Sequence, residues 1–359
     1  MKQGLLGMLG ALSVLLLLVS QPSSAEVYDL PPEGTDVIGA VTTVRARADD
    51  TLIDIARRHG LGYEDIVIAN PDVDVWLPGE GTEILLPTRF VLPPGPRRGV
   101  VLNLPEYRLY YYPKVAAGEK PVVMTFPMSI GRMDWETPLG ITRVTEKVKN
   151  PVWYPPDSVR AEHAAEGRPL PRVVPAGPDN PMGSRKMRLD IPGYLIHGTN
   201  RPAGVGMRVT HGCIRMFPED IEYLFEHVAI NTEVTIINAP VKMGWDGDEL
   251  VLEAHRILDV IAPPADAVLE DVADVLAGEA NRALTIAQLQ DPAMITEPQA
   301  ATSTANGLTA LTEQFVVVTA AQQGELDWAA AESQVAKPSG IPQSVGWRIK
   351  NAATSAAFE

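Results

Sequence analysis

The pattern of hydrophobic positions changes several times along the 359-residue chain, and each change predicts a structural boundary. An uninterrupted apolar stretch runs from Leu5 to Val19 behind the single charge of Lys2, and it is followed by Ser23-Ser24-Ala25. Small residues at −3 and −1 are typical of a signal-peptide cleavage site, so residues 1–25 are predicted to be an export signal. The stretch is shorter than the roughly 20 residues that a membrane span needs, but an uncleaved membrane anchor remains the alternative interpretation.

The next segments alternate between turn-rich and periodic patterns. Residues 26–40 contain the turn-forming run Pro31-Pro32-Glu33-Gly34 and are predicted to be a spacer. Residues 41–88 then predict a strand, two short helices and a closing strand. In the first of these helices Leu52, Ile55 and Ala56 share one face behind the capping residues Asp50-Thr51. The segment is therefore predicted to be a small α+β domain with the order β-α-α-β.

A Pro-rich stretch at residues 89–98 predicts a stiff linker to a second domain. From residue 99 to about 240 the chain is rich in β-branched and aromatic runs, which predict strands at 99–104, 108–112, 122–130, 140–148, 194–196 and 233–237. Pro218 begins a helix with acidic residues in its first turn. We therefore expect a mainly β domain with one or two helices. Residues 150–190 are Pro-rich and irregular, and a long irregular segment inside a compact domain favours a lid or binding loop.

The remaining residues, 241–359, predict a partly helical and acidic subdomain. Helices are expected at 250–260 and 267–276, a mobile Ala/Thr/Ser-rich segment at 299–306, and renewed apolar patterning at 314–336. This third of the chain has 17 acidic and 6 basic residues, so it holds most of the net charge of −15. Such an acidic chain is a poor partner for nucleic acid, whose phosphates need basic surfaces.

The sequence contains one cysteine, Cys213, and its neighbours suggest a reactive thiol. It lies in Thr210-His211-Gly212-Cys213-Ile214-Arg215, and a second histidine, His197, precedes it by 16 residues in Ile196-His197-Gly198-Thr199-Asn200. A thiol becomes a strong nucleophile when it loses its proton, and nearby imidazole and guanidinium groups are expected to lower its pKa. Backbone N–H groups near Gly212 and Cys213 are natural donors to an oxyanion.

Other interpretations of these residues stay open at this point. Cys213 could be an inert buried side chain, or His197, His211 and Cys213 could be three ligands of a zinc ion. A papain-like (NlpC-type) peptidase is less compatible, because there the cysteine precedes its histidine.

The two segments together resemble the YkuD-type L,D-transpeptidase family, whose motif places a histidine upstream of a Ser/Thr-x-Gly-Cys element. The resemblance extends over roughly residues 99–242 and implies a β-sandwich catalytic domain without a cofactor or metal. By that resemblance Cys213 is the nucleophile, His197 the base, Gly198 the carbonyl that fixes its tautomer, and His211 and Gly212 helpers near the oxyanion. The resemblance also implies substrate-binding roles for four residues: Arg215, which is expected to steer a carboxylate, and Thr210, Asn200 and Thr199.

The implied reaction is acyl transfer in peptidoglycan. Cys213 would attack the carbonyl of the third residue of a tetrapeptide stem, D-Ala would leave, and an amine would then take the acyl group. The domain order resembles the branch that anchors Braun-type lipoprotein to peptidoglycan, so a lipoprotein C-terminal lysine is the expected acceptor. Cross-linking of two stems (3→3) and L,D-carboxypeptidase activity are the alternatives within the enzyme class.

Residues 41–88 resemble the LysM module in Asp50-Thr51-Leu52, Ile55-Ala56, Asn70-Pro71 and the closing Leu86-Pro87. They depart from it at Asp49, where the family has a glycine, and an unrelated small α+β domain is the alternative. The resemblance implies binding to glycan that contains N-acetylglucosamine. With the export signal it predicts a periplasmic protein that binds the cell wall, and a non-catalytic wall-binding protein is the competing hypothesis from another class.

Overall fold

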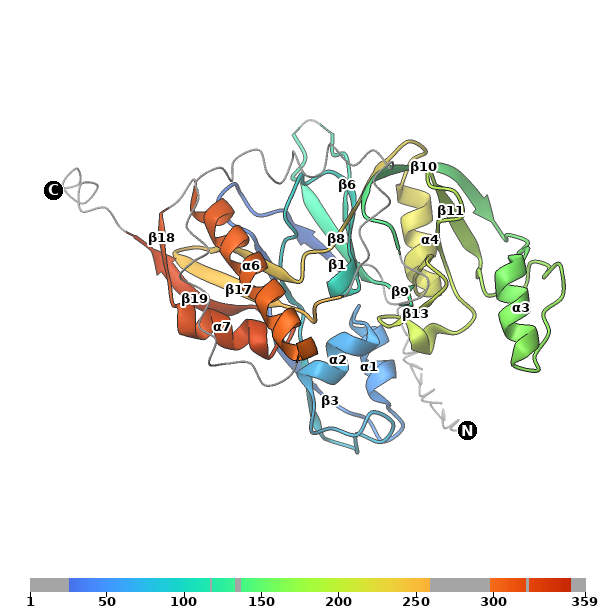
Figure 1. Cartoon of the computed structure of the whole chain (residues 1–359), viewed down its shortest axis with the longest axis horizontal. Coiled ribbons are helices and arrows are strands. Elements are labelled where there is room, and N and C mark those ends of the chain that lie inside the picture. Colours follow the sequence, from blue (N-terminus) through green and yellow to red (C-terminus); the bar gives the residue numbers. More distant parts are fainter. Residues whose placement is uncertain (1–25, 117, 133–136, 259–297, 321–322, 350–359) are drawn as a thin grey trace, which may run out of the picture.

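The computed structural model describes residues 26–116, 118–132, 137–258, 298–320 and 323–349 (Figure 1). The predicted export signal and the helix expected at 267–276 lie outside the described residues. Within those ranges, no helix combines the length and the apolar character that crossing a membrane would require.

A nine-stranded sheet forms the centre of the molecule and confirms the predicted mainly β domain. Its neighbouring strands are antiparallel except for the pairs β6–β15 and β12–β14. In spatial order the strands are β1 (Glu26–Asp29), β8 (Val122–Pro127), β7 (Arg108–Tyr112), β6 (Gly99–Asn103), β15 (Glu233–Ile237), β10 (Gly140–Lys149), β11 (Arg185–Leu189), β12 (Leu195–His197) and β14 (Ile214–Arg215).

The central strands are buried on both faces, which explains their near-continuous apolar sequences. In β6, Val100 and Leu102 belong to one hydrophobic core, whereas Val101 between them belongs to a second. The three tyrosines of β7 alternate in the same way and are all buried. The first core packs under helix α4 (Pro218–His227), which covers β11 (Figure 1).

The second core is shared with the small domain, which has the predicted β-α-α-β order. Its elements are β3 (Thr42–Arg45), α1 (Leu52–Arg58), α2 (Tyr63–Ala69) and β4 (Glu83–Leu86). Thr51 and Asp54 form a capping box at the start of α1. Leu52, Ile55 and Ile66 of this module lie in one cluster with Val101 and Tyr110 of the sheet. The module is thus packed against the central sheet.

The segments predicted to be a spacer and a linker contain short strands that pair with other parts of the fold. Residues 26–29 form β1, which pairs with β8 at the edge of the central sheet. Within the two predicted connectors, β2 (Val37–Gly39) pairs with β5 (Arg89–Val91). Strands of three or four residues beside prolines are too short to show a period of two, so the turn signals dominated the sequence pattern.

The C-terminal region is a four-stranded sheet with two helices against it. The strand order is β16 (Val241–Asp246), β17 (Glu249–Ala254), β19 (Gln343–Arg348) and β18 (Gly324–Leu326). The helices are α6 (Pro298–Ala320) and α7 (Trp328–Ala336). One prediction is wrong here: residues 250–254 form a strand, because a short apolar run buried on both sides does not distinguish strand from helix. Residues 299–306, where a mobile segment was expected, lie inside α6.

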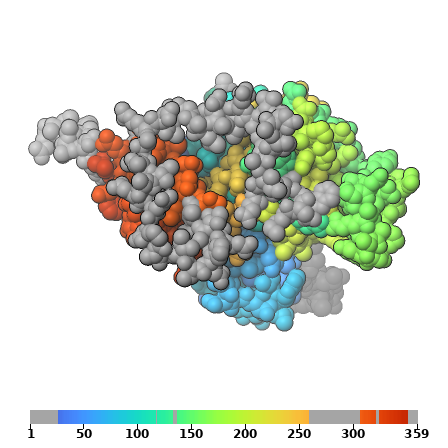
Figure 2. All heavy atoms as spheres, in the orientation of Figure 1, coloured from blue at the N-terminus to red at the C-terminus, as the bar shows by residue number. Residues whose placement is uncertain are grey.

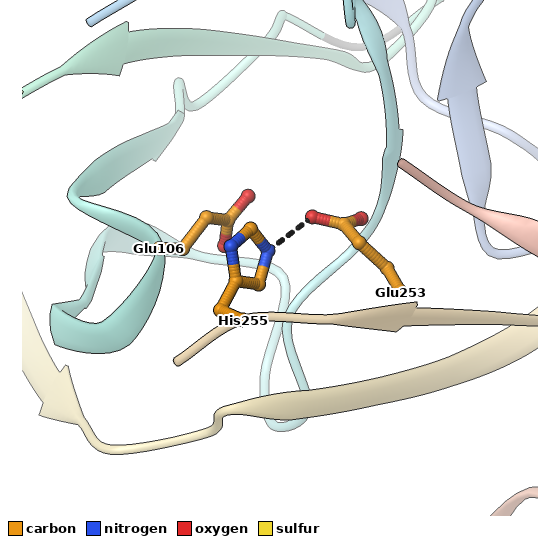
Figure 3. Close-up of side chains that lie close together, drawn as sticks. All are labelled: Glu106, Glu253 and His255. Carbon is orange, nitrogen blue, oxygen red and sulfur yellow. Dashed lines mark hydrogen bonds and ion pairs between the residues drawn. The ribbon is translucent and has the colours of Figure 1, made fainter. Parts of the chain in front are cut away.

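A buried network of charges joins the C-terminal sheet to the central one (Figure 3). The Lys242 ammonium lies 2.8 Å from a carboxylate oxygen of Glu106 and 2.9 Å from one of Glu253, and all three side chains are almost completely buried. Glu253 also accepts a hydrogen bond from the backbone N–H of Val91 in β5 at 2.6 Å. The imidazole of His255 lies 2.6 Å from Glu253. These contacts connect the C-terminal sheet to the central sheet and to β5, which lies in the segment predicted to be a linker.

Five short elements complete the described fold: η1 (Leu104–Glu106), β9 (Ile130–Gly131), α3 (Asp157–Ala165), η2 (Pro202–Gly204) and β13 (Arg208–Thr210). η1 joins β6 to β7, and β9 pairs with β13. Helix α3 protrudes at one end of the molecule, on the segment predicted to be a lid (Figures 1 and 2).

Candidate active site

The parallel pairing of β12 with β14 brings the two predicted catalytic segments together. Ile196 is in register with Ile214, and His197 with Arg215. Side chains in register on parallel strands point to the same face, and residues two apart on a strand share a face. His197 and Arg215 therefore face the same side of the sheet edge, and Cys213 lies in the turn immediately before β14.

His197 is held as a neutral imidazole in one orientation. Its Nδ1 lies 2.6 Å from the carbonyl oxygen of Gly198, and because a carbonyl can only accept, Nδ1 carries the proton. Nε2 is then the atom that can accept a proton. Burial is the main cause that lowers the pKa of His197 to about 3, and the positive charge of Arg215 lowers it further. This geometry fits the tautomer expected from the sequence.

The pKa of Cys213 is shifted upward, whereas the sequence led us to expect a lowered pKa. Burial raises the pKa of the thiol above its ordinary value, and a backbone hydrogen bond from Leu195 and the charge of Arg215 offset this only in part. The Sγ atom lies 3.6 Å from the carbonyl oxygen of Gly193. Because the imidazole is neutral as well, the resting pair is a thiol and an imidazole rather than a thiolate and an imidazolium.

The turn that carries Cys213 is fixed by two hydroxyl groups. Thr210 Oγ1 donates to the carbonyl of Cys213 at 2.6 Å, and Thr137 Oγ1 donates to the carbonyl of Gly212 at 2.9 Å. Gly212 has φ of +94°, which an L side chain rarely adopts. In a planar peptide the N–H points away from the C=O, so the N–H of Cys213 is aimed away from Thr137. Thr210 thus shapes the turn, and Thr137 is a contributor that the sequence did not indicate.

His211 faces the predicted lid. Its Nε2 lies 2.8 Å from a carboxylate oxygen of Glu162 on α3, and the other carboxylate oxygen of Glu162 lies 2.8 Å from Arg132. The interaction with His211 and then that with Arg132 lower the pKa of Glu162. Glu162 was missed because its segment has no periodicity or motif that ties it to residue 211.

Arg215 is half-buried, and among the described residues it has no carboxylate partner. Its Nε forms no hydrogen bond there. Burial lowers the pKa of its guanidinium, and the nearby charge of Arg201 lowers it further. Two guanidinium groups without a counter-charge in the described structure favour an incoming anion.

Thr199 and Asn200 act on the backbone around the site. Thr199 Oγ1 accepts from the N–H of Arg201 at 2.9 Å, and Asn200 Nδ2 donates to the carbonyl of Asp179 at 2.9 Å. Asn200 is exposed and Thr199 is buried. These contacts link the segment after His197 to the Pro-rich loop before it.

The zinc alternative finds no support in the geometry of the described residues. The group there whose ligand atoms all lie within 4.8 Å of one another is Glu106, Glu253 and His255, and not His197, His211 and Cys213 (Figure 3). In that group Lys242 already supplies the positive charge between the two carboxylates. A pocket lined by Glu106 and His255 of this group, and by Glu64, Tyr107 and Arg256 among others, contains none of the predicted site residues.

Comparison with known proteins identifies the family. The L,D-transpeptidase catalytic domain (YkuD) matches residues 97–236. The "probable L,D-transpeptidase ErfK/SrfK" of Salmonella typhimurium is 44% identical over 247 residues, which cover 68% of this chain and 78% of that protein. This chain belongs to the L,D-transpeptidase family. The "probable L,D-transpeptidase YcfS" of Escherichia coli is 38% identical over 255 residues, or 70% of this chain and 77% of that protein.

Among solved structures, the catalytic domain of the L,D-transpeptidase from E. faecium is 20% identical, with a TM-score of 0.30. The match covers 40% of this chain and all of that one. The match to the YkuD family model and the identity to ErfK/SrfK confirm the resemblance to this family. The matched family model begins at residue 97, so the LysM identity of residues 41–88 remains a prediction.

Proposed function

We propose that this chain is an exported peptidoglycan L,D-transpeptidase in which Cys213 is the nucleophile and His197 the general base. The observation that carries the proposal is the register of β12 and β14, which aligns His197 with Arg215 and sets the Cys213 turn at the end of the same strand pair. Family membership supplies the class of reaction.

The first half of the reaction breaks the bond to terminal D-Ala. As Sγ attacks the carbonyl of the third residue of a tetrapeptide stem, its proton passes to Nε2 of His197. The N–H of Cys213 stabilises the developing oxyanion. When the amide bond breaks, the nitrogen of D-Ala takes the proton from Nε2, and a thioester remains on Cys213.

The second half passes the acyl group to an amine. The acceptor nitrogen attacks the thioester, gives a proton to Nε2, and releases Sγ, which takes that proton back. A lipoprotein C-terminal lysine is the acceptor that we favour. A second stem would give a 3→3 cross-link instead, and water would give a trimmed stem.

Arg215 is proposed to bind the carboxylate of the donor stem, together with Arg201. Arg215 is in register with His197, close to the Cys213 turn, and its guanidinium has no carboxylate partner among the residues described. A planar guanidinium can hold a carboxylate through two parallel hydrogen bonds, which would place the scissile carbonyl near Sγ.

The β-α-α-β module is proposed to bind glycan in the manner of a LysM domain. Its loop between α2 and β4 exposes two large apolar side chains, with exposed fractions of 63% for Trp76 and 79% for Leu77. Exposed aromatic rings provide a flat surface for sugar rings. Residues 150–190 are proposed to be a lid, since Glu162 contacts His211. The signal predicted at residues 1–25 would direct the protein to the periplasm.

Intact-mass analysis tests the function. The mature protein is incubated with a disaccharide-tetrapeptide, with and without a peptide that ends in the lipoprotein lysine. We expect an acyl adduct on Cys213 that the lysine peptide discharges into a ligated product, while Cys213→Ala forms no adduct and releases no D-Ala. Folded wild-type protein that forms no adduct and releases no D-Ala would support the non-catalytic wall-binding alternative.

A further inference from the structure

The module contacts the chain immediately before the Cys213 segment, defined here as residues 207–216. The first two N–H groups of α2, those of Tyr63 and Glu64, donate to the carbonyls of Val205 and Gly206 at 2.9 and 3.3 Å. The first N–H groups of a helix have no partner within it, so this contact satisfies two of them.

The approach at this end is too close for any residue but glycine. A Cβ atom on Gly206 would lie 2.5 Å from the Cα of Gly62 and 2.4 Å from the nitrogen of Tyr63, and a Cβ atom on Gly62 would lie 2.7 Å from the Cα of Gly206. Gly206 also has φ of +85°. The two backbones are therefore in direct contact, with no side chain between them to absorb a shift.

A second contact lies immediately after the same segment. Arg57 of α1 makes two hydrogen bonds, of 2.7 and 2.8 Å, to the two carboxylate oxygens of Glu219 in the first turn of α4. The guanidinium of Arg57 also lies 5.4 Å from the centre of the Phe217 ring. A bidentate Arg–carboxylate pair fixes both distance and orientation. Helices α1 and α2 thus contact both ends of the stretch that carries Cys213 (Figure 1).

The module itself is anchored to the central sheet by a buried ion pair. Arg108 of β7 is fully buried and lies 2.6 Å from Asp65 of α2, and it donates to the carbonyl of Gly60 at 3.2 Å. Asp65 in turn accepts from the N–H of Gly62 at 2.9 Å. Asp65 therefore connects the buried ion pair directly to Gly62, the residue that contacts Gly206.

We propose that the β-α-α-β module is a positioning element of the active site, which holds the Cys213 segment at both ends and so sets where the thiol lies relative to His197. This inference rests on the proposed role of Cys213. The proposed role affects the chemical step. It is independent of whether the module binds glycan.

Charge reversal at the second contact tests the proposal with a glycan-free tetrapeptide, so that glycan binding cannot affect the result. We expect Arg57→Glu to lower kcat for D-Ala release about tenfold while KM changes less than about twofold, since small misplacements of reacting groups cost this much or more. The reversed pair Arg57→Glu/Glu219→Arg should restore most of kcat. Arg45→Glu is the matched control, since Arg45 is an exposed residue of the same module, and it should leave kcat unchanged.

Gly206→Ala is the second variant, and it should lower kcat at the other end of the segment. Thermal unfolding of each variant shows that it is folded. If folded Arg57→Glu and Gly206→Ala both keep the wild-type kcat, or if the reversed pair fails to restore kcat, the positioning role is wrong. If wild-type protein releases no D-Ala at all, the proposed function fails and this inference fails with it.

Discussion

Burial of a neutral His197 destabilises the folded protein in mild acid by an amount that can be measured. The pKa of this imidazole is about 3 in the folded protein, against an ordinary value of 6.5. As the pH falls below 6.5, the unfolded chain binds a proton at this residue that the folded protein does not. The free energy of unfolding therefore falls as the pH falls, and the loss levels off near pH 3.

The loss of unfolding free energy at pH 5 follows from the difference between this pH and the pKa of His197 in the unfolded chain. Each pH unit below 6.5 removes about 1.4 kcal/mol, so His197 alone removes about 2 kcal/mol at pH 5 and almost nothing at pH 7.5. In His197→Gln the amide can still donate to the Gly198 carbonyl, but no group titrates. The variant should therefore lose about 2 kcal/mol less than the wild type between pH 7.5 and pH 5.

Urea unfolding followed by tryptophan fluorescence at the two pH values gives the comparison. Other groups that titrate in this range, such as the partly buried His59, do so in both proteins and cancel in the difference. His197→Asn repeats the test with a different neutral side chain. An equal decline in stability for the wild type and both variants would show that His197 takes up its proton normally in the folded state, and the neutral pair at rest would then be refuted.

Three further predictions concern single side chains. Glu162→Gln should lower kcat/KM for D-Ala release about tenfold, because His211 and Arg132 lose a shared carboxylate, whereas Glu166→Gln near the same helix should have little effect. Lys242→Met should lower the free energy of unfolding by about 3–5 kcal/mol in denaturant melts, because it leaves two buried carboxylates without their cation, while Lys120→Met at an exposed pair should change it by less than about 1 kcal/mol. Arg215→Lys should raise KM about tenfold for a tetrapeptide with a free carboxylate but not for its C-terminal amide, and an equal rise for both peptides would show that Arg215 does not bind the carboxylate.

The family could be predicted from sequence because its motif depends on local order. The only cysteine, its glycine and threonine neighbours, and a histidine 16 residues earlier identify the segments wherever the fold places them. The sign of the thiol pKa could not be predicted in this way, because it depends on burial, which outweighs the charge of Arg215. Burial is a property of the packed structure and is not encoded in the neighbours of Cys213.

The organisation of the chain was harder to predict for a similar reason. Residues 41–88 gave the correct element order, but nothing in them indicates that Ile66 shares a core with Tyr110 or that Gly62 meets Gly206. Proline-rich stretches indicated a spacer and a linker, yet β1 and β5 lie inside them and pair with other strands. Contacts between segments far apart in sequence decided these points, and a single sequence gives no direct sign of them.

In the proposed mechanism, a neutral Cys213 thiol and a neutral His197 imidazole at rest make the timing of deprotonation decisive. A permanent thiolate would be a stronger nucleophile at rest, but it would also be the form that oxidants attack, and a lone cysteine has no second thiol to restore it. Keeping Cys213 protonated confines its reactivity to the moment when a carbonyl lies within reach of Sγ and Nε2 can take the proton. Such a mechanism demands exact placement of the thiol, because proton transfer and attack must occur together. The backbone contact at Gly206 and the bidentate pair at Glu219 are the contacts that we propose to provide this placement.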